Sequence, residues 1–438
     1  MKEDFEEREY MEVSGWPIGY EDLKPYYKKA EEILGTDATV PFSYQPWREF
    51  HIDEPSFSSS TINLFVTKWC KVPNFSVQHG SKLRESKAIT MLSNANVVEL
   101  IPAGAIDAVE SLRIRSLDGK EGFVNAKYVI AAGGAMETVR LFLASDKFYP
   151  GGLGNKNGLV GRYFQDHCAA VVGRIYPHDR QQFHDVFDPF YKNGFKYLPR
   201  IRLNPSAARI QKILHASAQI VFSKRETGIL ENAKNILNAI KKKRLPSVSD
   251  VKLLLNPSKF STILKAAYRW RIQHRGSSNK GPIWLEIHSE QEPSFASCIK
   301  LGDSKDALGM PRICLDWNIS DLTIETIKKT AKLVQKEFNN SKIGKVVLEP
   351  WVLEEERRSL RWVRDVYHQS GGLKMGDNEQ SGVVDRDCKV FGVKNLYVAS
   401  SAVFPTSSFS NPTMTTIALA IRICETVKAN FRGIREVN

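Results

Sequence analysis

The sequence has few cysteines, and their spacing excludes the structures that paired cysteines usually build. Six occur among 438 residues, and no two form a Cys-x-x-Cys pair. We therefore expect neither a disulfide framework nor a structural zinc site, and no metal ligands are assigned. Reduced, buried thiols are the default for Cys70, Cys168, Cys298, Cys314, Cys388 and Cys424.

Long apolar runs, a targeting signal and a hydrolase signature are also missing. No stretch of about 18 apolar residues occurs, so no membrane-spanning helix is predicted. The acidic N-terminus lacks the hydrophobic region of a signal peptide, so we expect a cytoplasmic protein if Met1 is the true start. The serine-rich residues 407–410 lack the Gly-x-Ser-x-Gly elbow, which argues against a serine hydrolase.

The composition is that of an ordinary globular protein, with 42% hydrophobic and 25% charged residues and length enough for two domains. The net charge of +13 is uneven, because residues 224–275 hold 13 Lys and Arg against three acidic residues. A solvated, partly helical excursion is the default explanation. Interleaved apolar residues make a membrane surface or an acidic partner the alternatives, and no nucleic-acid partner is predicted.

Periodicity and turn residues predict a mixture of helices and strands. An amphipathic helix follows Pro17 and ends at Gly35, and residues 36–80 look like a loop. Residues 154–167 look like a Gly/Asn-rich loop that ends in a short polar helix. A second amphipathic helix is predicted over residues 323–338. Strands are predicted over residues 87–100, 109–115, 122–129, 282–288, 299–303 and 312–317, with Asp-Gly or Asp-to-Gly turns between the paired runs.

Residues 366–427 contain the strongest candidate for a functional site. They combine a His in a Gly-rich turn, a short strand at 395–399, a polar loop closed by Asn411-Pro412, and an apolar helix. Pro412 suits the first helical position, and the apolar run 417–427 predicts a buried helix. An imidazole, a carboxamide and a helix N-terminus would then face one point, with free N–H groups and the positive end of the helix dipole.

Residues 128–145 are a second candidate. An apolar strand, the pair Gly133-Gly134 and a helix follow one another, as they do where backbone approaches a phosphate or nucleotide. A glycine pair also lets a helix pack closely on a strand, so this signal alone leaves both interpretations open.

Together these segments resemble the glucose–methanol–choline (GMC) flavoprotein oxidoreductases. The resemblance rests on HQSGGLKMG, GVVD and VKNLYVASSAVFPTSSFSNPTMTTIALAIR in the tail. It is supported, in the same order along the chain, by SGWPIGYEDLKPYYKKAEEILG, AAGGAMETVRLFLAS, GNKNGLVGRYFQDH and EQEPSFASCIKLGDSKDALGMPRICLDW. It extends over residues 14–427, is poorest over 224–280, and is closer to sugar- and polyol-oxidising members with an Asn partner than to His–His members.

The sequence departs from the family at one point. The family opens with a strand–GxGxxG–helix for the FAD pyrophosphate, and no such motif occurs in this sequence. A truncated reading frame, a separate chain carrying that unit, or a remnant would each account for the departure. Truncation is favoured because the motifs that are present look intact.

The resemblance implies an α/β (α+β) fold of GMC type, with a discontinuous FAD-binding domain and an antiparallel-sheet substrate domain. Residues 1–80 would be a helical or loop segment bordering the FAD domain, and residues 81–168 a part of that domain. Residues 169–350 would form the substrate domain, with the basic helical insertion at 224–280. Residues 351–438 would return to the FAD domain with the catalytic His and Asn.

The resemblance also implies FAD-dependent oxidation of a primary or secondary alcohol, a sugar or polyol, with an electron acceptor that the sequence does not identify. His368 would act as the general base, and Asn411 would hold the substrate oxygen. Backbone N–H groups of Thr413 and Met414, after Pro412, would face the flavin C2 carbonyl. The alternatives are a catalytically silent fragment that cannot bind FAD alone, or one half of a split enzyme.

Further FAD contacts are carried over from the family. They are Val97 on the adenine side, Ala132, Gly133 and Gly134 beside the pyrophosphate, and Ser400 and Ser401 in the loop after the short strand. Asn before Pro is also a common helix cap, so Asn411 has a purely structural alternative. His167 and His288 are interpreted as structural, and His288 is also a candidate for the wall of the substrate cleft.

Overall fold

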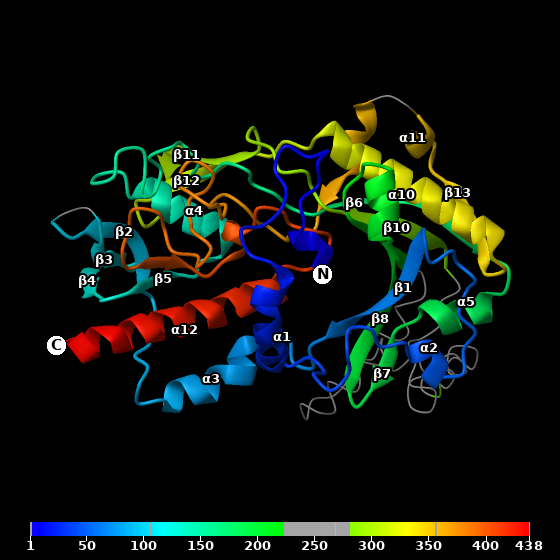
Figure 1. The fold of residues 1–438 in the computed structure, drawn as a ribbon, viewed down its shortest axis with the longest axis horizontal. Coiled ribbons are helices and arrows are strands. Elements are labelled where there is room, and N and C mark those ends of the chain that lie inside the picture. The colour runs from blue at the N-terminus through cyan, green and yellow to red at the C-terminus, as the bar shows by residue number, and fades with distance from the viewer. Residues whose placement is uncertain (1, 105–106, 223–267, 269–280, 355–356, 438) are drawn as a thin grey trace, which may run out of the picture.

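The computed structural model describes residues 2–104, 107–222, 268, 281–354 and 357–437. It is a mixed α/β structure in two parts, with the largest sheet at one end and three smaller sheets at the other (Figure 1). The 3-10 helix η1 (Lys2–Phe5), at the N-terminus, lies between the two parts (Figure 1). Almost all of the basic window 224–275 lies outside the described residues, so the predictions made for it stay predictions.

Eight antiparallel strands form the largest sheet. Its order is β1–β8–β9–β10–β6–β13, with β7 beside β8 and β14 beside β6. The strands are β1 (Ile62–Trp69), β6 (Cys168–Pro177), β7 (Phe190–Lys192), β8 (Phe195–Leu203), β9 (Ala216–Phe222), β10 (Ile283–Ser289), β13 (Gly344–Leu348) and β14 (Arg364–Asp365). Strands from residue 62 to residue 365 therefore meet in one sheet, and their register places distant side chains next to one another.

One face of this sheet is apolar and carries the main hydrophobic core. Successive side chains along a strand point to opposite faces, and Ile201, Ala218 and Ile287 share the apolar face. Helix α10 (Asp321–Asn340) covers it, burying the stripe that includes Ile327 and Phe338. The other face is free to carry polar side chains.

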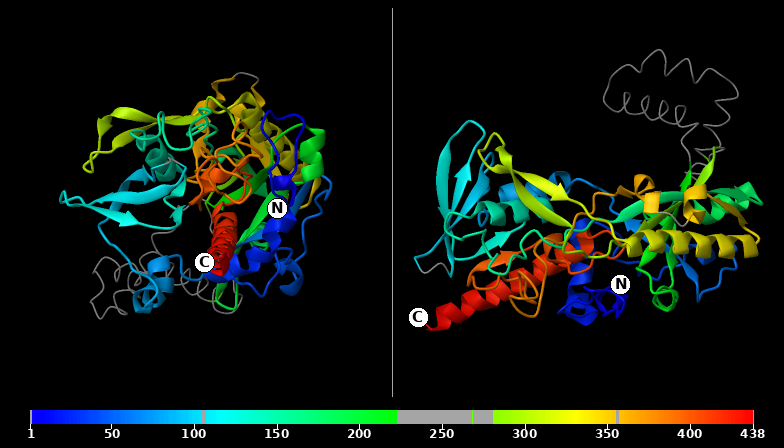
Figure 2. Two further views of the ribbon diagram at one scale, coloured as in Figure 1. Left: turned by 60° about the vertical axis from the view of Figure 1, so that its left-hand side comes forward. Right: turned by 90° about the horizontal axis from the view of Figure 1, so that it is seen from above.

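The second part is built from three small sheets. One is antiparallel, from β2 (Asn96–Pro102), β3 (Val109–Arg115) and β4 (Glu121–Asn125), and a second is the hairpin of β11 (Cys298–Lys305) and β12 (Pro311–Asp316). The third joins β5 (Val129–Ala131) in parallel to β15 (Leu396–Val398). Seen from above, the first two stand at one end, and α10 extends toward the other (Figure 2).

Helices complete the second part. Helix α4 (Gly134–Ala144) follows β5, and helix α12 (Thr413–Val437) packs against α1 (Tyr20–Leu34) through a small cluster of Ala30, Ala418 and Ile421. The shorter elements are α2 (Pro46–Glu49), α3 (Phe75–Glu85), α5 (Arg180–Phe187), α6 (Pro205–Ile210), α11 (Pro350–Leu353), η2 (Arg357–Trp362) and η3 (Ser401–Val403).

Several sequence predictions are confirmed. Helix α1 ends where Gly35 adopts the left-handed conformation, with φ of 69°, as its position after the amphipathic run predicts. Helix α10 and the hairpin β11–β12 form where expected, and the Asp-Gly turn joins β3 to β4 through Gly119, whose φ is 85°. The predicted fold class, a mixed α/β structure with antiparallel sheets, is also confirmed.

Four local predictions are wrong. Residues 36–80 contain β1 and α3 rather than only loop, and β2 begins at Asn96 rather than at residue 87. The short polar helix expected before residue 167 is absent, because Gln165 pairs with Ser370 and leads into β6. Helix α12 is not buried throughout, since only one stripe faces the core. Tertiary pairing, which short-range patterns do not report, decides each of these cases.

In the part of the chain that the structure describes, no helix combines the length and the apolar character needed to cross a bilayer. All six cysteines are free thiols.

Removing the Phe338 ring from the core tests the packing of α10. Phe338 is fully buried and its ring lies 6.0 Å from that of Phe187. We expect Phe338→Ala to lower the free energy of unfolding by about 3–5 kcal/mol, because it leaves a cavity in the core where α10 packs against α5. Urea unfolding followed by circular dichroism measures this. Lys336→Ala, on the exposed side of the same helix, is the control, and an equal loss in both variants would contradict this packing.

Candidate active site

The turn that carries His368 is held by the segment that leads into β6. Strand β14 pairs with β6, and three residues after β14 the His368 N–H donates to Asp166 Oδ1 at 2.9 Å. The backbones of Ser370 and Gln165 then exchange hydrogen bonds of 2.9 and 2.8 Å. The position of this His is therefore set by backbone contacts with residues some 200 positions earlier in the chain.

Two glycines make this close approach possible. Gly371 and Gly372 have φ of 73° and 93°, backbone angles that residues other than glycine rarely adopt. A Cβ on Gly371 would lie 2.0 Å from the Tyr163 carbonyl oxygen, and one on Gly372 would lie 2.6 Å from a methyl group of Val139. The Gly-Gly pair thus has a steric reason, which is to bring the turn against its neighbours.

The imidazole of His368 is half-buried and kept neutral. Its Nδ1 is enclosed, and among the described residues neither ring nitrogen has a hydrogen-bond partner. Burial is the main cause that lowers the pKa of His368, and the nearby His288 and Arg200 lower it further. A neutral imidazole with free nitrogens can accept a proton.

A second imidazole lies beside it. The rings of His167 and His368 are 4.9 Å apart between centroids. His167 is fully buried, its Nε2 lies 3.2 Å from the Ser407 carbonyl oxygen, and burial followed by His368 lowers its pKa to about 3. His167, interpreted from sequence as structural, therefore forms the wall behind His368 and stays uncharged.

The loop after β15 is joined directly to the His368 turn. Ser401 Oγ donates to the Gln369 carbonyl at 2.7 Å, and the Gly371 N–H donates to the Ser401 carbonyl at 3.0 Å. The Ser400 hydroxyl accepts from the Ala402 N–H and caps η3. Both serine hydroxyls, predicted as FAD contacts, thus hold the local backbone together.

The start of α12 presents the second half of the predicted site. The Pro412 carbonyl accepts from the Thr416 N–H at 2.9 Å, so Pro412 caps the helix and Thr413 opens it, one residue later than predicted. The Asn411 and Thr413 side chains are exposed, and Met414 packs toward α1. No hydrogen bond joins Asn411 to His368 among the described residues.

The predicted pyrophosphate contacts lie beside the loop that holds Ser400. Strands β5 and β15 are parallel neighbours, and the Ala399 N–H donates to the Ala131 carbonyl at 2.9 Å. Ala132, Gly133 and Gly134 follow β5 at this same edge, exposed and opening α4 without a side-chain cap. A Cβ at Gly134 would meet nothing within 4 Å, so this backbone is open to a ligand.

These features fit a dinucleotide such as FAD. Ligands of parallel sheets bind at the carboxyl ends of the strands, where helix N-termini offer N–H groups to phosphate. Val97 lies elsewhere, in β2 opposite Ile114 and half-buried against the same core that holds α4.

Sequence reasoning missed the polar face of the large sheet, opposite α10. The register places Gln219 of β9 beside Glu286 of β10, and Ser217 beside His288. Glu286 accepts from Arg364 at 2.6 Å and lies 2.9 Å from His288 Nε2. His288, weighed for the substrate cleft, belongs to this face. The only local signal was polar residues alternating within apolar strands.

A buried ion pair anchors the loop around Ser408, which leads to Asn411. Arg8 donates to Glu290 through two bonds of 2.5 and 2.8 Å, and both side chains are almost fully buried. Glu290 also accepts from the Ser408 N–H at 3.3 Å. Burial alone would raise the pKa of Glu290, but Arg8 outweighs it and holds that pKa below its usual value.

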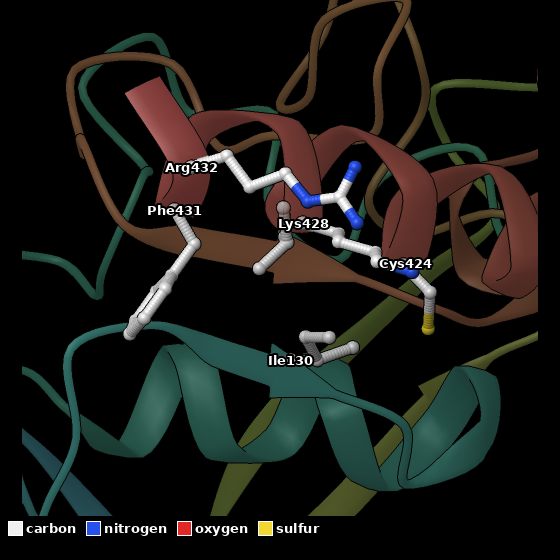
Figure 3. Close-up of a pocket in the computed structure, with 6 residues that line it drawn as sticks. Ile130, Cys424, Lys428, Phe431 and Arg432 are labelled. Atoms are coloured by element: carbon white, nitrogen blue, oxygen red, sulfur yellow. The ribbon is translucent and has the colours of Figure 1, made fainter. Parts of the chain in front are cut away.

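A separate pocket opens between β5 and the C-terminal half of α12, lined by Ile130, Cys424, Val427, Lys428, Phe431 and Arg432 (Figure 3). Its helical residues begin about 16 Å along the axis from the start of α12. It lacks the paired acid–base groups of the His368 region, so we do not place the chemistry there. No cluster of His, Cys, Asp or Glu among the described residues could hold a metal ion.

Comparison with known proteins finds similarity to GMC oxidoreductases. Residues 293–420 match the model of a family described as GMC oxidoreductase. A 2-methyl-1,2-propanediol dehydrogenase from Mycolicibacterium austroafricanum is 22% identical over 465 residues, covering 96% of this chain and 75% of that protein. A C-glycoside 3-oxidase from Microbacterium trichothecenolyticum is 31% identical over 143 residues, or 32% of this chain and 26% of the oxidase.

One solved structure shares the fold at low sequence identity. An FAD-dependent oxidoreductase from Chaetomium thermophilum superposes with a TM-score of 0.52 at 13% identity, covering 93% of this chain and 72% of that one. The match to formate oxidase of Aspergillus oryzae spans 63% of that enzyme's length and 80% of this chain, with a TM-score of 0.48 at 17% identity.

Breaking the Arg8–Glu290 pair tests the anchor. We expect Glu290→Gln to lower the free energy of unfolding by about 3–5 kcal/mol at neutral pH, because Arg8 is left buried without a counter-charge. The pKa of Glu290 is lowered by folding, so its contribution is present above its ordinary pKa and is lost as the pH falls through the lowered one. The deficit of the variant in urea unfolding should therefore shrink on acidification.

Arg8→Met combined with Glu290→Gln is the matched test, because it removes the buried charge and should recover part of the loss. Glu21→Gln, at an exposed pair with Lys24, should leave stability unchanged. A deficit that stays the same from neutral to acidic pH would contradict the assignment.

Proposed function

We propose that the chain, which matches the GMC oxidoreductase family model over residues 293–420, oxidises a hydroxyl group of a small alcohol, a sugar or polyol, with FAD as cofactor. The observation that carries the proposal is the neutral, half-buried imidazole of His368, whose ring nitrogens have no partner among the described residues. The names of the relatives, which are dehydrogenases and oxidases, support it.

FAD would be held chiefly by backbone. The exposed N–H groups of residues 132–134 suit the pyrophosphate, and those of Thr413 and Met414 suit the electron-rich edge of the flavin. When bound, the cofactor supplies the acceptor for the hydride of the carbinol carbon.

His368 would take the hydroxyl proton. We assign it to Nε2, because Nδ1 is enclosed by protein. The neighbouring imidazole of His167 stays neutral, so it does not repel the imidazolium that forms on His368. The lowered pKa of His368 keeps it free of a proton at neutral pH before the substrate arrives.

Asn411 would orient the substrate. Its exposed side chain, immediately before α12, has no hydrogen bond to a described residue. A carboxamide there can both donate to and accept from the substrate hydroxyl, and so hold the carbinol carbon in line for hydride transfer.

The second candidate is a chain that acts with a separate dinucleotide-binding partner. Two observations favour keeping it: no GxGxxG motif occurs in the sequence, and the parallel sheet of β5 and β15 has only two strands of three residues among the described elements. Two-stranded parallel sheets are weak in isolation. Alcohol oxidation that appears only after such a chain is added would favour this candidate.

Replacement of His368 tests the base. We expect His368→Ala to leave FAD binding unchanged and to lower the rate of flavin reduction by an alcohol about 10²–10⁴-fold, as loss of a general base does. Stopped-flow absorbance measures the reduction. His51→Ala, at an exposed His, is the control, and near-normal reduction in His368→Ala would refute the assignment.

The pH profile gives an independent test. The base works only when unprotonated, so kcat/KM should fall as the pH falls through the pKa of His368. Because burial and neighbouring cations lower that pKa, the fall should lie below the ordinary His value of 6.5. Activity that halves above pH 6.5 would contradict the environment assigned to His368.

A further inference from the structure

Arg200, on the polar face of the large sheet, has no carboxylate partner among the described residues. Arg200 of β8 is 7% exposed, although its side chain is charged. Its Nη2 donates to Gln219 Oε1 at 2.6 Å, and its Nε is buried without an acceptor. Burial lowers the pKa of Arg200 to about 10, and the charge of Glu286 offsets this only in part.

The carboxylates near Arg200 are already engaged. Glu286 accepts from Arg364 at 2.6 Å through one oxygen and lies 2.9 Å from His288 through the other. Asp166 Oδ1 accepts from the backbone N–H groups of His167 and His368. The carboxylate of Glu286 therefore already serves Arg364 and His288, and Arg200 has no carboxylate partner of its own among the described residues. A buried cation without such a partner is costly.

Arg200 is also close to the proposed base. It lies beside Gln219, which is opposite Glu286 in the neighbouring strand. Burial is the largest cause that lowers the pKa of His288 and of His368, and the charge of Arg200 lowers both further. The hydroxyl of Ser217, opposite His288, is buried without a partner as well. The Arg200 Nε and the Ser217 hydroxyl, both buried without a partner, therefore lie on the same face of the sheet as His288, whose charge also acts on His368.

We propose that Arg200 determines substrate specificity by binding the carboxylate of a small hydroxy acid whose hydroxyl group lies against His368. The inference rests on the proposed alcohol oxidation and adds the class of alcohol. A guanidinium group matches a carboxylate through two parallel N–H···O bonds, which neither a hydroxyl nor an amide offers. The carboxylate does not react. It neutralises the buried cation and fixes which hydroxyl meets the base.

Matched pairs of ligands separate charge from shape. Lactate and propane-1,2-diol share a carbon skeleton, as do glycolate and ethylene glycol. We expect calorimetric titration of the purified chain to show roughly 10- to 100-fold tighter binding of each hydroxy acid than of its diol, from the charge-assisted contacts. Arg200→Met should abolish that preference and leave diol binding unchanged.

Two further variants make the result specific. Arg174→Met removes an exposed guanidinium from the same sheet, in register with Trp284 and about 13 Å along the strand from His288. It should keep the preference for acids. Arg200→Lys keeps the charge but loses the planar fork, so it should weaken acid binding several-fold even if the Met variant fails to fold.

The outcomes distinguish this inference from the proposed function. Equal binding of lactate by the native chain and Arg200→Met, or tighter binding of the diols by the native chain, would overturn the Arg200 subsite even if alcohols are oxidised. Arg200-dependent lactate binding in a chain that oxidises no alcohol would support the subsite and refute the proposed function.

Discussion

The structure depends on the buried ion pair between Arg8 and Glu290. It joins three segments that are far apart in the sequence: the N-terminal residues, the end of strand β10, and the loop that leads to Asn411. Two charges removed from water stabilise a protein only when their hydrogen bonds are satisfied, and here Arg8 and Glu290 share two. The N-terminal segment is therefore an integral part of the site, although it carries no predicted catalytic residue.

Neighbouring contacts extend this anchor. The Trp16 indole N–H donates to Thr406 at 3.0 Å, and its ring lies 4.9 Å from that of Phe404. The Phe409 ring, in turn, lies 6.2 Å from that of Phe65 on β1, so the loop also reaches the polar side of the large sheet. In Figure 1 the N-terminus accordingly lies between the two parts of the molecule. The loop is held from both sides, which keeps the carboxamide and the base in fixed relation.

The two parts of the molecule contribute different groups to the proposed site. The parallel pair β5–β15 offers open backbone at its carboxyl edge, where a nucleotide can be held. The antiparallel sheet offers charged side chains, among them Arg200, which has no carboxylate partner among the described residues. His368 lies where they meet, because its turn is bonded to Ser401 on one side and to Asp166 on the other.

Motifs that encode backbone geometry could be predicted from the sequence. The Gly371-Gly372 pair indicated a turn with close contacts, and the structure shows a clash for any side chain there. Asn411-Pro412 indicated the start of a helix to within one residue. The periodicity of α10 was equally informative, since helix and apolar stripe are local properties.

Features created by strand register could not be predicted. Arg200, Gln219 and Glu286 become neighbours only because β8, β9 and β10 pair in one alignment. The contact of His167 with His368 likewise joins residues about 200 positions apart, so its sequence context suggested only a structural role. Strand β1 was missed because its partner, β8, lies far along the chain and its own pattern is mixed.

The most direct test of the central claim is the visible absorption spectrum of the purified chain after incubation with FAD and gel filtration. We expect a flavin band that co-elutes with the protein and is bleached under anaerobic conditions by a hydroxy acid or another small alcohol. A colourless protein, or a retained flavin that no alcohol reduces, would contradict the claim that these residues form an alcohol-oxidising flavin site.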